Sequence, residues 1–122
     1  MRRRGILFVF GVIIAMLCPV PGRAAELLMV TTKGCPWCAK WEQELGRIYP
    51  RTPEGRRAPL RRVELRGFAE PLVLLDRLVY TPTFVLIDQG REIGRIVGYQ
   101  SEDAFWGLLD RLIRQLDDRS PH

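Results

Sequence analysis

Two cysteines separated by two residues are the side chains in this sequence best suited to covalent chemistry. They lie in the run Gly34-Cys35-Pro36-Trp37-Cys38, and cysteines one helical turn apart are close enough to form a disulfide. The thiolate of such a pair attacks a disulfide in a partner, and the second thiol then resolves the mixed disulfide. The spacing therefore predicts a redox centre, with Cys35 as the nucleophile and Cys38 as the resolving thiol.

The segments around the pair predict that Cys35 lies at the start of a helix. Residues 27–31 read as a buried strand, residues 32–34 as a turn, and Pro36 suits a first helical turn. A helix start presents unpaired N–H groups and the positive end of the helix dipole, and both favour a thiolate. Lys33 adds a positive charge nearby. We therefore expect the pKa of Cys35 to lie below the ordinary thiol value of about 8.5.

Three other interpretations of the cysteine pair stay open. A structural disulfide is one, although so short a loop gives little entropic stabilisation. A zinc site is another, but zinc needs four ligands, and after the first 24 residues the sequence offers only these two cysteines and His122 as cysteine or histidine ligands. Two unrelated buried thiols are the third. The sequence favours redox chemistry without a metal or organic cofactor.

The predicted helix after Cys35 carries one apolar stripe and ends at Pro50. The stripe consists of Cys38, Trp41, Leu45 and Ile48. Trp41 is therefore predicted in the core. Trp37, between the cysteines, is predicted either to contact partners or to shield the disulfide, and Trp106 to pack near the surface.

The remaining patterns predict one small α/β domain. After a loop at 51–62 come a strand at 61–66, a short helix at 71–77, a buried strand at 83–87, its hairpin partner at 92–97 and a closing amphipathic helix from Ser101. This order predicts a mixed four-stranded sheet with helices on both faces.

The first 24 residues have the three-part organisation of a secretory signal peptide. Three arginines precede an apolar stretch at 5–19, and small residues precede the predicted cleavage after Ala24. The stretch is shorter than the roughly 20 residues that span a bilayer, although an uncleaved anchor stays an alternative. Residues 25–122 would then be a periplasmic domain in an oxidising compartment, with no membrane attachment.

The net charge of +5 comes largely from this leader. Its first 23 residues hold four basic side chains and no acidic ones, and the rest of the chain has 15 basic against 14 acidic. This balance, without interleaved aromatic residues, gives no indication of a nucleic-acid partner. A dense group of arginines either steers an acidic partner or forms a solvated surface. Its members are Arg51, Arg56, Arg57, Arg61, Arg62 and Arg66.

The strand, the Cys-Pro-Trp-Cys motif, the helix and the later Thr81-Pro82-Thr83 resemble the thioredoxin-like superfamily over residues 26–117. The resemblance implies a trimmed thioredoxin-like fold in which Pro82 follows a cis peptide bond and packs against the cysteine pair. It implies that the backbone of Thr81 binds an incoming peptide. It also assigns Pro36 to support of the active site and Trp37 to support and substrate contact.

A narrower resemblance is to small periplasmic thioredoxins encoded with bacterial sulfur-oxidation (Sox) clusters. The leader, the motif and the segments 52–62 and 98–106 carry it. It implies reduction of a protein disulfide, mixed disulfide or persulfide in the periplasm, with a membrane thiol-reductant transporter as electron donor. Two alternatives remain. The first is a glutathione-dependent, glutaredoxin-like oxidoreductase, because Cys-Pro-Trp-Cys also resembles the Cys-Pro-Tyr-Cys of glutaredoxins. The second is a non-catalytic docking module with a structural disulfide.

Overall fold

One four-stranded sheet forms the centre of residues 25–119, the part of the chain that this computed structural model describes. The strand order is β2-β1-β3-β4, with β1 (Glu26–Thr31) and β3 (Thr83–Asp88) in the middle and β2 (Leu60–Glu64) and β4 (Arg91–Val97) at the edges. β1 and β2 are parallel, whereas the other neighbours are antiparallel. The predicted mixed sheet is confirmed, and its apolar central strands are buried as the sequence indicates. The predicted signal peptide lies outside the described residues.

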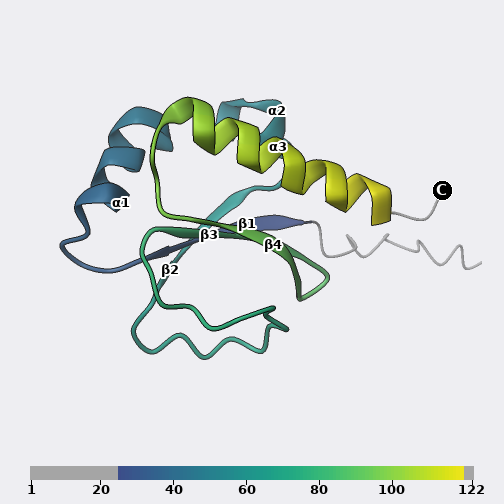
Figure 1. The fold of residues 1–122 in the computed structure, drawn as a ribbon, viewed down its shortest axis with the longest axis horizontal. Coiled ribbons are helices and arrows are strands. Elements are labelled where there is room, and N and C mark those ends of the chain that lie inside the picture. The colour runs from purple at the N-terminus through teal and green to yellow at the C-terminus, as the bar shows by residue number, and fades with distance from the viewer. Residues whose placement is uncertain (1–24, 120–122) are drawn as a thin grey trace, which may run out of the picture.

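The helices lie on one side of this sheet (Figure 1). The first helical stretch is α1 (Pro36–Trp41) followed by the π-helix η1 (Glu42–Gly46). A 3₁₀ turn η2 (Tyr49–Arg51) and a short helix α2 (Pro53–Arg57) follow within the predicted loop, and α3 (Glu102–Arg119) is the predicted closing helix. None of the helices within 25–119 combines the length and the apolar character that a bilayer crossing requires.

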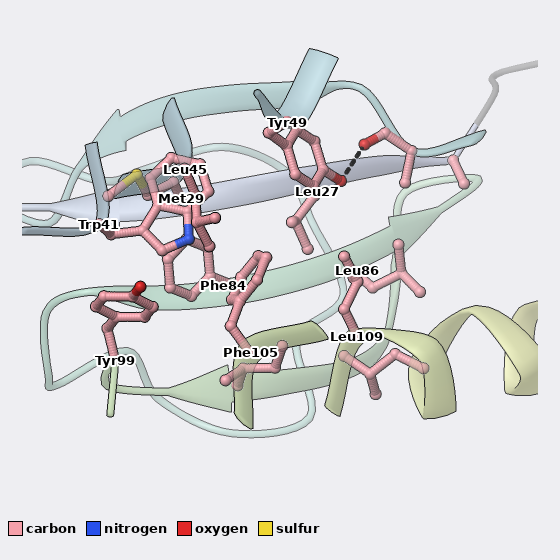
Figure 2. Packing of buried hydrophobic residues seen from close by; sticks show 14 of the residues in the cluster. Leu27, Met29, Trp41, Leu45, Tyr49, Phe84, Leu86, Tyr99, Phe105 and Leu109 are labelled. Carbon is pink, nitrogen blue, oxygen red and sulfur yellow. Dashed lines mark hydrogen bonds between the residues drawn. The ribbon is translucent and has the colours of Figure 1, made fainter. Parts of the chain in front are cut away.

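The π-helical turn overturns one predicted core position. Ile48 is 52% exposed, whereas the next residue, Tyr49, is fully buried. A π-turn bonds each N–H to the carbonyl five residues back instead of four, so the residues after it rotate away from the α-helical stripe. Tyr49 therefore takes the inward position, and its hydroxyl donates a hydrogen bond of 2.6 Å to the carbonyl of Ala58 (Figure 2).

Aromatic side chains join this helical stretch to the sheet and to α3 (Figure 2). Trp41 is fully buried as predicted, with its ring 5.2 Å from that of Phe84 and 5.6 Å from that of Phe105. Trp106 is partly buried and stacks on Tyr49 at 6.0 Å with nearly parallel rings. Such ring pairs add to the stabilisation that burial itself gives, and here they fix α1 relative to β3.

The opposite face of the sheet is covered by the irregular segment 65–82 (Figure 1). The prediction of a helix at 71–77 is wrong, so the helices of residues 25–119 lie on one face of the sheet and not on both faces as predicted. Leu72 and Leu74 pack against the sheet while Val73 between them is 55% exposed, which is the alternation of an extended chain. The apolar residues of this segment therefore cover the face of the sheet that the predicted helix would have covered.

Candidate active site

Cys35 and Cys38 form a disulfide where the turn after β1 enters α1, with their Cα atoms 5.3 Å apart. Cys35 is the N-cap of α1, and Pro36 occupies the first helical position, where its missing N–H removes no bond. The Sγ of Cys35 accepts a hydrogen bond of 3.2 Å from the backbone N–H of Cys38. A donor held in this position stabilises negative charge on the sulfur once the disulfide is reduced.

The two sulfur-bearing residues differ in their accessibility. Cys38 is only 6% exposed and belongs to the main core cluster, whereas Cys35 is partly buried at its edge. An incoming partner therefore reaches Cys35 more readily than Cys38. This asymmetry matches the chemistry in which one sulfur attacks and the other resolves.

A cavity of about 490 Å³ lies beside the disulfide and contains one charged pair. The two cysteines line it together with Met29, Thr31, Thr32, Gly34, Pro36, Ala39, Glu42 and Arg62. Glu42 accepts two hydrogen bonds from the Arg62 guanidinium, of 2.5 and 2.8 Å, and these bonds raise the pKa of Arg62. Neither residue is predicted as part of the site from the sequence. Glu42 follows Cys38 by one helical turn, so its spacing could indicate it, whereas the position of Arg62 depends on the strand register that pairs it with Met29.

Trp37 lies exposed between the cysteines. Its side chain is 53% accessible, and the ammonium group of Lys40 lies 5.4 Å from the ring centroid. A cation at this distance is attracted by the electron-rich face of the ring. The exposed part of the ring is available to a molecule that approaches the disulfide.

The loop before β3 is fastened to the turn that precedes Cys35. The Thr81–Pro82 peptide bond is cis, and Pro82 is buried. The hydroxyl oxygens of Thr32 and Thr81 are hydrogen-bonded at 3.0 Å, and the N–H of Gly98 donates to the carbonyl of Pro82 at 2.7 Å. The structure thus brings the Thr81–Pro82 loop beside the disulfide turn, although 49 positions separate Thr32 from Thr81 in the chain.

Comparison with known proteins agrees with this arrangement. A family description of the thioredoxin-like domain matches residues 22–113. The chain belongs to the thioredoxin-like family. Among solved structures it is similar to the periplasmic thioredoxin SoxS from Paracoccus pantotrophus in its reduced form, with 45% identity and a TM-score of 0.73 over 75% of this chain and 98% of that one. It is also similar to Trxlp from Edwardsiella tarda EIB202, with 26% identity and a TM-score of 0.54 over 71% of this chain and 82% of that one.

No curated protein sequence matches the chain significantly. The family predicted from the motif is nevertheless confirmed, as is the resemblance to a periplasmic thioredoxin. A thioredoxin-like fold with two cysteines at disulfide distance is the framework of a thiol–disulfide oxidoreductase, and this is the enzyme class of the chain. Across residues 25–119, no group of three or more His, Cys, Asp or Glu side chains is placed to hold a metal ion.

The arginine group of the sequence divides into two sets. Arg57 pairs with Asp117, Arg61 with Glu26 and Glu70, and Arg62 with Glu42. Hydrogen bonding to Arg61 lowers the pKa of Glu70. The other three arginines, Arg51, Arg56 and Arg66, are exposed and make no ion pair with any residue in 25–119. The charges of this group are therefore not equivalent, because three of the six arginines are paired with carboxylates of the chain and three are not.

Proposed function

We propose that the protein reduces a disulfide or persulfide of a partner protein in the periplasm, through Cys35 and Cys38. The hydrogen bond from the Cys38 N–H to the Cys35 Sγ, at the start of α1, is the observation that carries this proposal. It supports a nucleophilic thiolate at Cys35, the more accessible of the two cysteines. The 45% identity to a periplasmic thioredoxin supports the location and a thioredoxin-like role.

The reaction on a disulfide proceeds in two exchanges. The Cys35 thiolate attacks one partner sulfur, the partner's S–S bond breaks, and its other sulfur leaves as a thiolate. Cys38 then loses its proton and attacks the Cys35 Sγ of the mixed disulfide. The Cys35–Cys38 bond forms, and the second partner sulfur leaves as a thiolate. Two electrons have passed to the partner, and the protein is left with the disulfide seen in the structure.

Three neighbouring residues would serve the docking of the partner. Trp37 offers an exposed ring beside the disulfide, and the Thr81–Pro82 loop lies against the disulfide turn. We assign the backbone of Thr81 to binding an extended peptide segment, and Pro82 to packing against the cysteine pair. Pro36 maintains the start of α1.

The reductive cycle needs a source of electrons outside the protein. We propose that a dithiol carried by a membrane transporter reduces the Cys35–Cys38 disulfide after each turnover, by the same exchange in reverse. Residues 1–24 would act as a cleaved signal peptide, which leaves residues 25–122 as the periplasmic domain.

Covalent trapping tests the proposal. In a Cys38→Ser variant the resolving thiol is gone, so a mixed disulfide between Cys35 and its partner should accumulate in periplasmic extracts. The Cys35→Ser variant is the matched control and should trap far less. A redox titration against defined thiol buffers then fixes the direction, and a potential far more oxidising than about −150 mV would contradict reduction. Turnover that requires glutathione would instead favour a glutaredoxin-like enzyme, and a disulfide that traps no partner would favour a docking module.

A further inference from the structure

A second cavity lies beside the disulfide turn, on the side of β2. It has a volume of about 610 Å³ and is lined by Thr32, Lys33, Glu64 and Arg66. Thr32 lines this cavity and also the cavity of about 490 Å³ beside the disulfide, so the two cavities adjoin at the turn that precedes Cys35. A molecule bound to Cys35 is therefore within reach of the second cavity.

The parallel pairing of β1 and β2 explains why these side chains meet. Thr31 lies opposite Glu64, and the N–H of Leu65 extends the pairing with a bond of 2.8 Å to the carbonyl of Thr31. The carboxyl ends of parallel strands reach the same edge of a sheet. Arg66, the next residue after this pairing, is thereby placed beside the Thr32–Lys33 turn.

The two cations of this cavity are not neutralised by the described part of the protein. Neither Lys33 nor Arg66 makes an ion pair within residues 25–119, and both are exposed. Arg61 and Arg62, on the same strand, each bind carboxylates of the protein itself. Glu64 is the only carboxylate that residues 25–119 contribute to the cavity lining, so in this part of the chain two positive charges face one negative charge.

We propose that this cavity binds an acidic side chain of the partner polypeptide, close to the partner's reactive cysteine. The inference rests on the proposed function and specifies which partners it favours. A guanidinium and an ammonium group form charge-assisted hydrogen bonds with a carboxylate, and unpaired cations beside a reactive centre raise the encounter rate with an acidic segment. Arg56 and Arg57, which the sequence also suggested for steering, lie on α2 away from this cavity, and Arg57 is already paired.

The experiment compares three peptide disulfides that differ at one residue flanking the reactive cysteine, which is Asp, Asn or Lys. The reduced protein is expected to reduce the Asp peptide about fivefold faster than the Asn peptide at low salt, with the Lys peptide slowest. High salt should reduce the difference in rate between the Asp and Asn peptides, because it screens the charges. In the Arg66→Gln variant the ratio of Asp to Asn rates should fall toward one, whereas the matched control Arg56→Gln should keep it. Reduction of the uncharged hydroxyethyl disulfide corrects for any change in the reactivity of Cys35.

Equal rates for the three peptides, or a preference that Arg66→Gln leaves intact, would overturn the inference and leave the proposed function standing. Failure to reduce any peptide or the hydroxyethyl disulfide would contradict the proposed function, and the inference with it.

Discussion

The hydroxyl groups of Thr32 and Thr81 share a hydrogen bond of 3.0 Å between the disulfide turn and the loop before β3. Thr32 lines both cavities beside the cysteines, and Thr81 precedes the buried Pro82. The bond therefore fixes the position of the loop assigned to peptide binding relative to the reactive sulfur.

Replacing Thr81 tests the importance of this bond. Thr81→Val keeps the side-chain volume but removes the hydroxyl, so it should lower the free energy of unfolding by about 1 kcal/mol and slow peptide reduction. Thr81→Ser retains the hydroxyl and is the matched control. Chemical denaturation and peptide reduction rates measure the two effects. A loss in Thr81→Ser with none in Thr81→Val would show that the methyl group matters and the hydrogen bond does not.

Two glycines in helices should respond to alanine with opposite signs. A Cβ on Gly55 would collide with the backbone carbonyl of Tyr49. A backbone atom cannot move aside as the end of a flexible side chain can. Gly55→Ala should therefore lower the free energy of unfolding by about 1–3 kcal/mol. Gly107 lies in α3 with open space around it, so Gly107→Ala should raise that free energy by about 0.5–1 kcal/mol. Denaturant unfolding of both variants measures this contrast, and a shift in the same direction for both would contradict it.

The fold could be predicted from the sequence where periodicity is simple, and not where the backbone departs from a regular period. The four strands and the closing helix follow from apolar runs and a 3.6-residue repeat. The π-turn at Glu42–Gly46 has no such signature, so α-helical periodicity predicts Ile48 in the core although Tyr49 is the buried residue.

This change of register leads to a prediction about Ile48 and Tyr49. Ile48→Gln alters an exposed side chain and should change the free energy of unfolding by no more than about 0.5 kcal/mol. Tyr49→Ala removes a fully buried ring and its bond to Ala58, and should cost about 3–5 kcal/mol. Thermal or urea unfolding of the two variants distinguishes the positions. A larger loss of unfolding free energy for Ile48→Gln than for Tyr49→Ala would contradict the π-helical register and favour the α-helical one.

The candidate site, like the fold, has residues that the sequence predicts and residues that it does not. The short motif indicates Cys35 and Cys38 directly, whereas the role of Pro82 follows from the resemblance to the thioredoxin-like superfamily, because local sequence marks only a Thr-Pro pair before an apolar run. The partners of the arginines were not predictable, since Arg61 binds Glu26 from 35 positions away and the choice depends on strand register. The difference between Arg66 and its paired neighbours, on which the acidic-partner proposal depends, is visible only in the folded chain.

We expect the ion pair between Arg61 and Glu70 to contribute to the free energy of unfolding at neutral pH and to lose that contribution in acid. Hydrogen bonding to Arg61 lowers the pKa of Glu70 in the folded state. Its stabilisation is therefore present above the ordinary carboxyl range and is lost as the pH falls through the lowered pKa. Glu70→Gln should be less stable than the parent at about pH 7 and nearly equal to it at about pH 2.5 in urea unfolding. Glu64→Gln, which removes a carboxylate with no ion pair in residues 25–119, is the control. A Glu70→Gln difference that does not shrink in acid would contradict this account.

The proposed mechanism requires that Cys35 of the reduced protein ionises more readily than an ordinary thiol. The rate of alkylation followed against pH, in the parent and in Cys38→Ser, reports the pKa of this thiol. The hydrogen bond from the Cys38 N–H and the position at the start of α1 predict a pKa clearly below the ordinary value of about 8.5. If neither cysteine ionises below the ordinary thiol range, the sulfur at the start of α1 is not an activated nucleophile and the proposed mechanism is wrong.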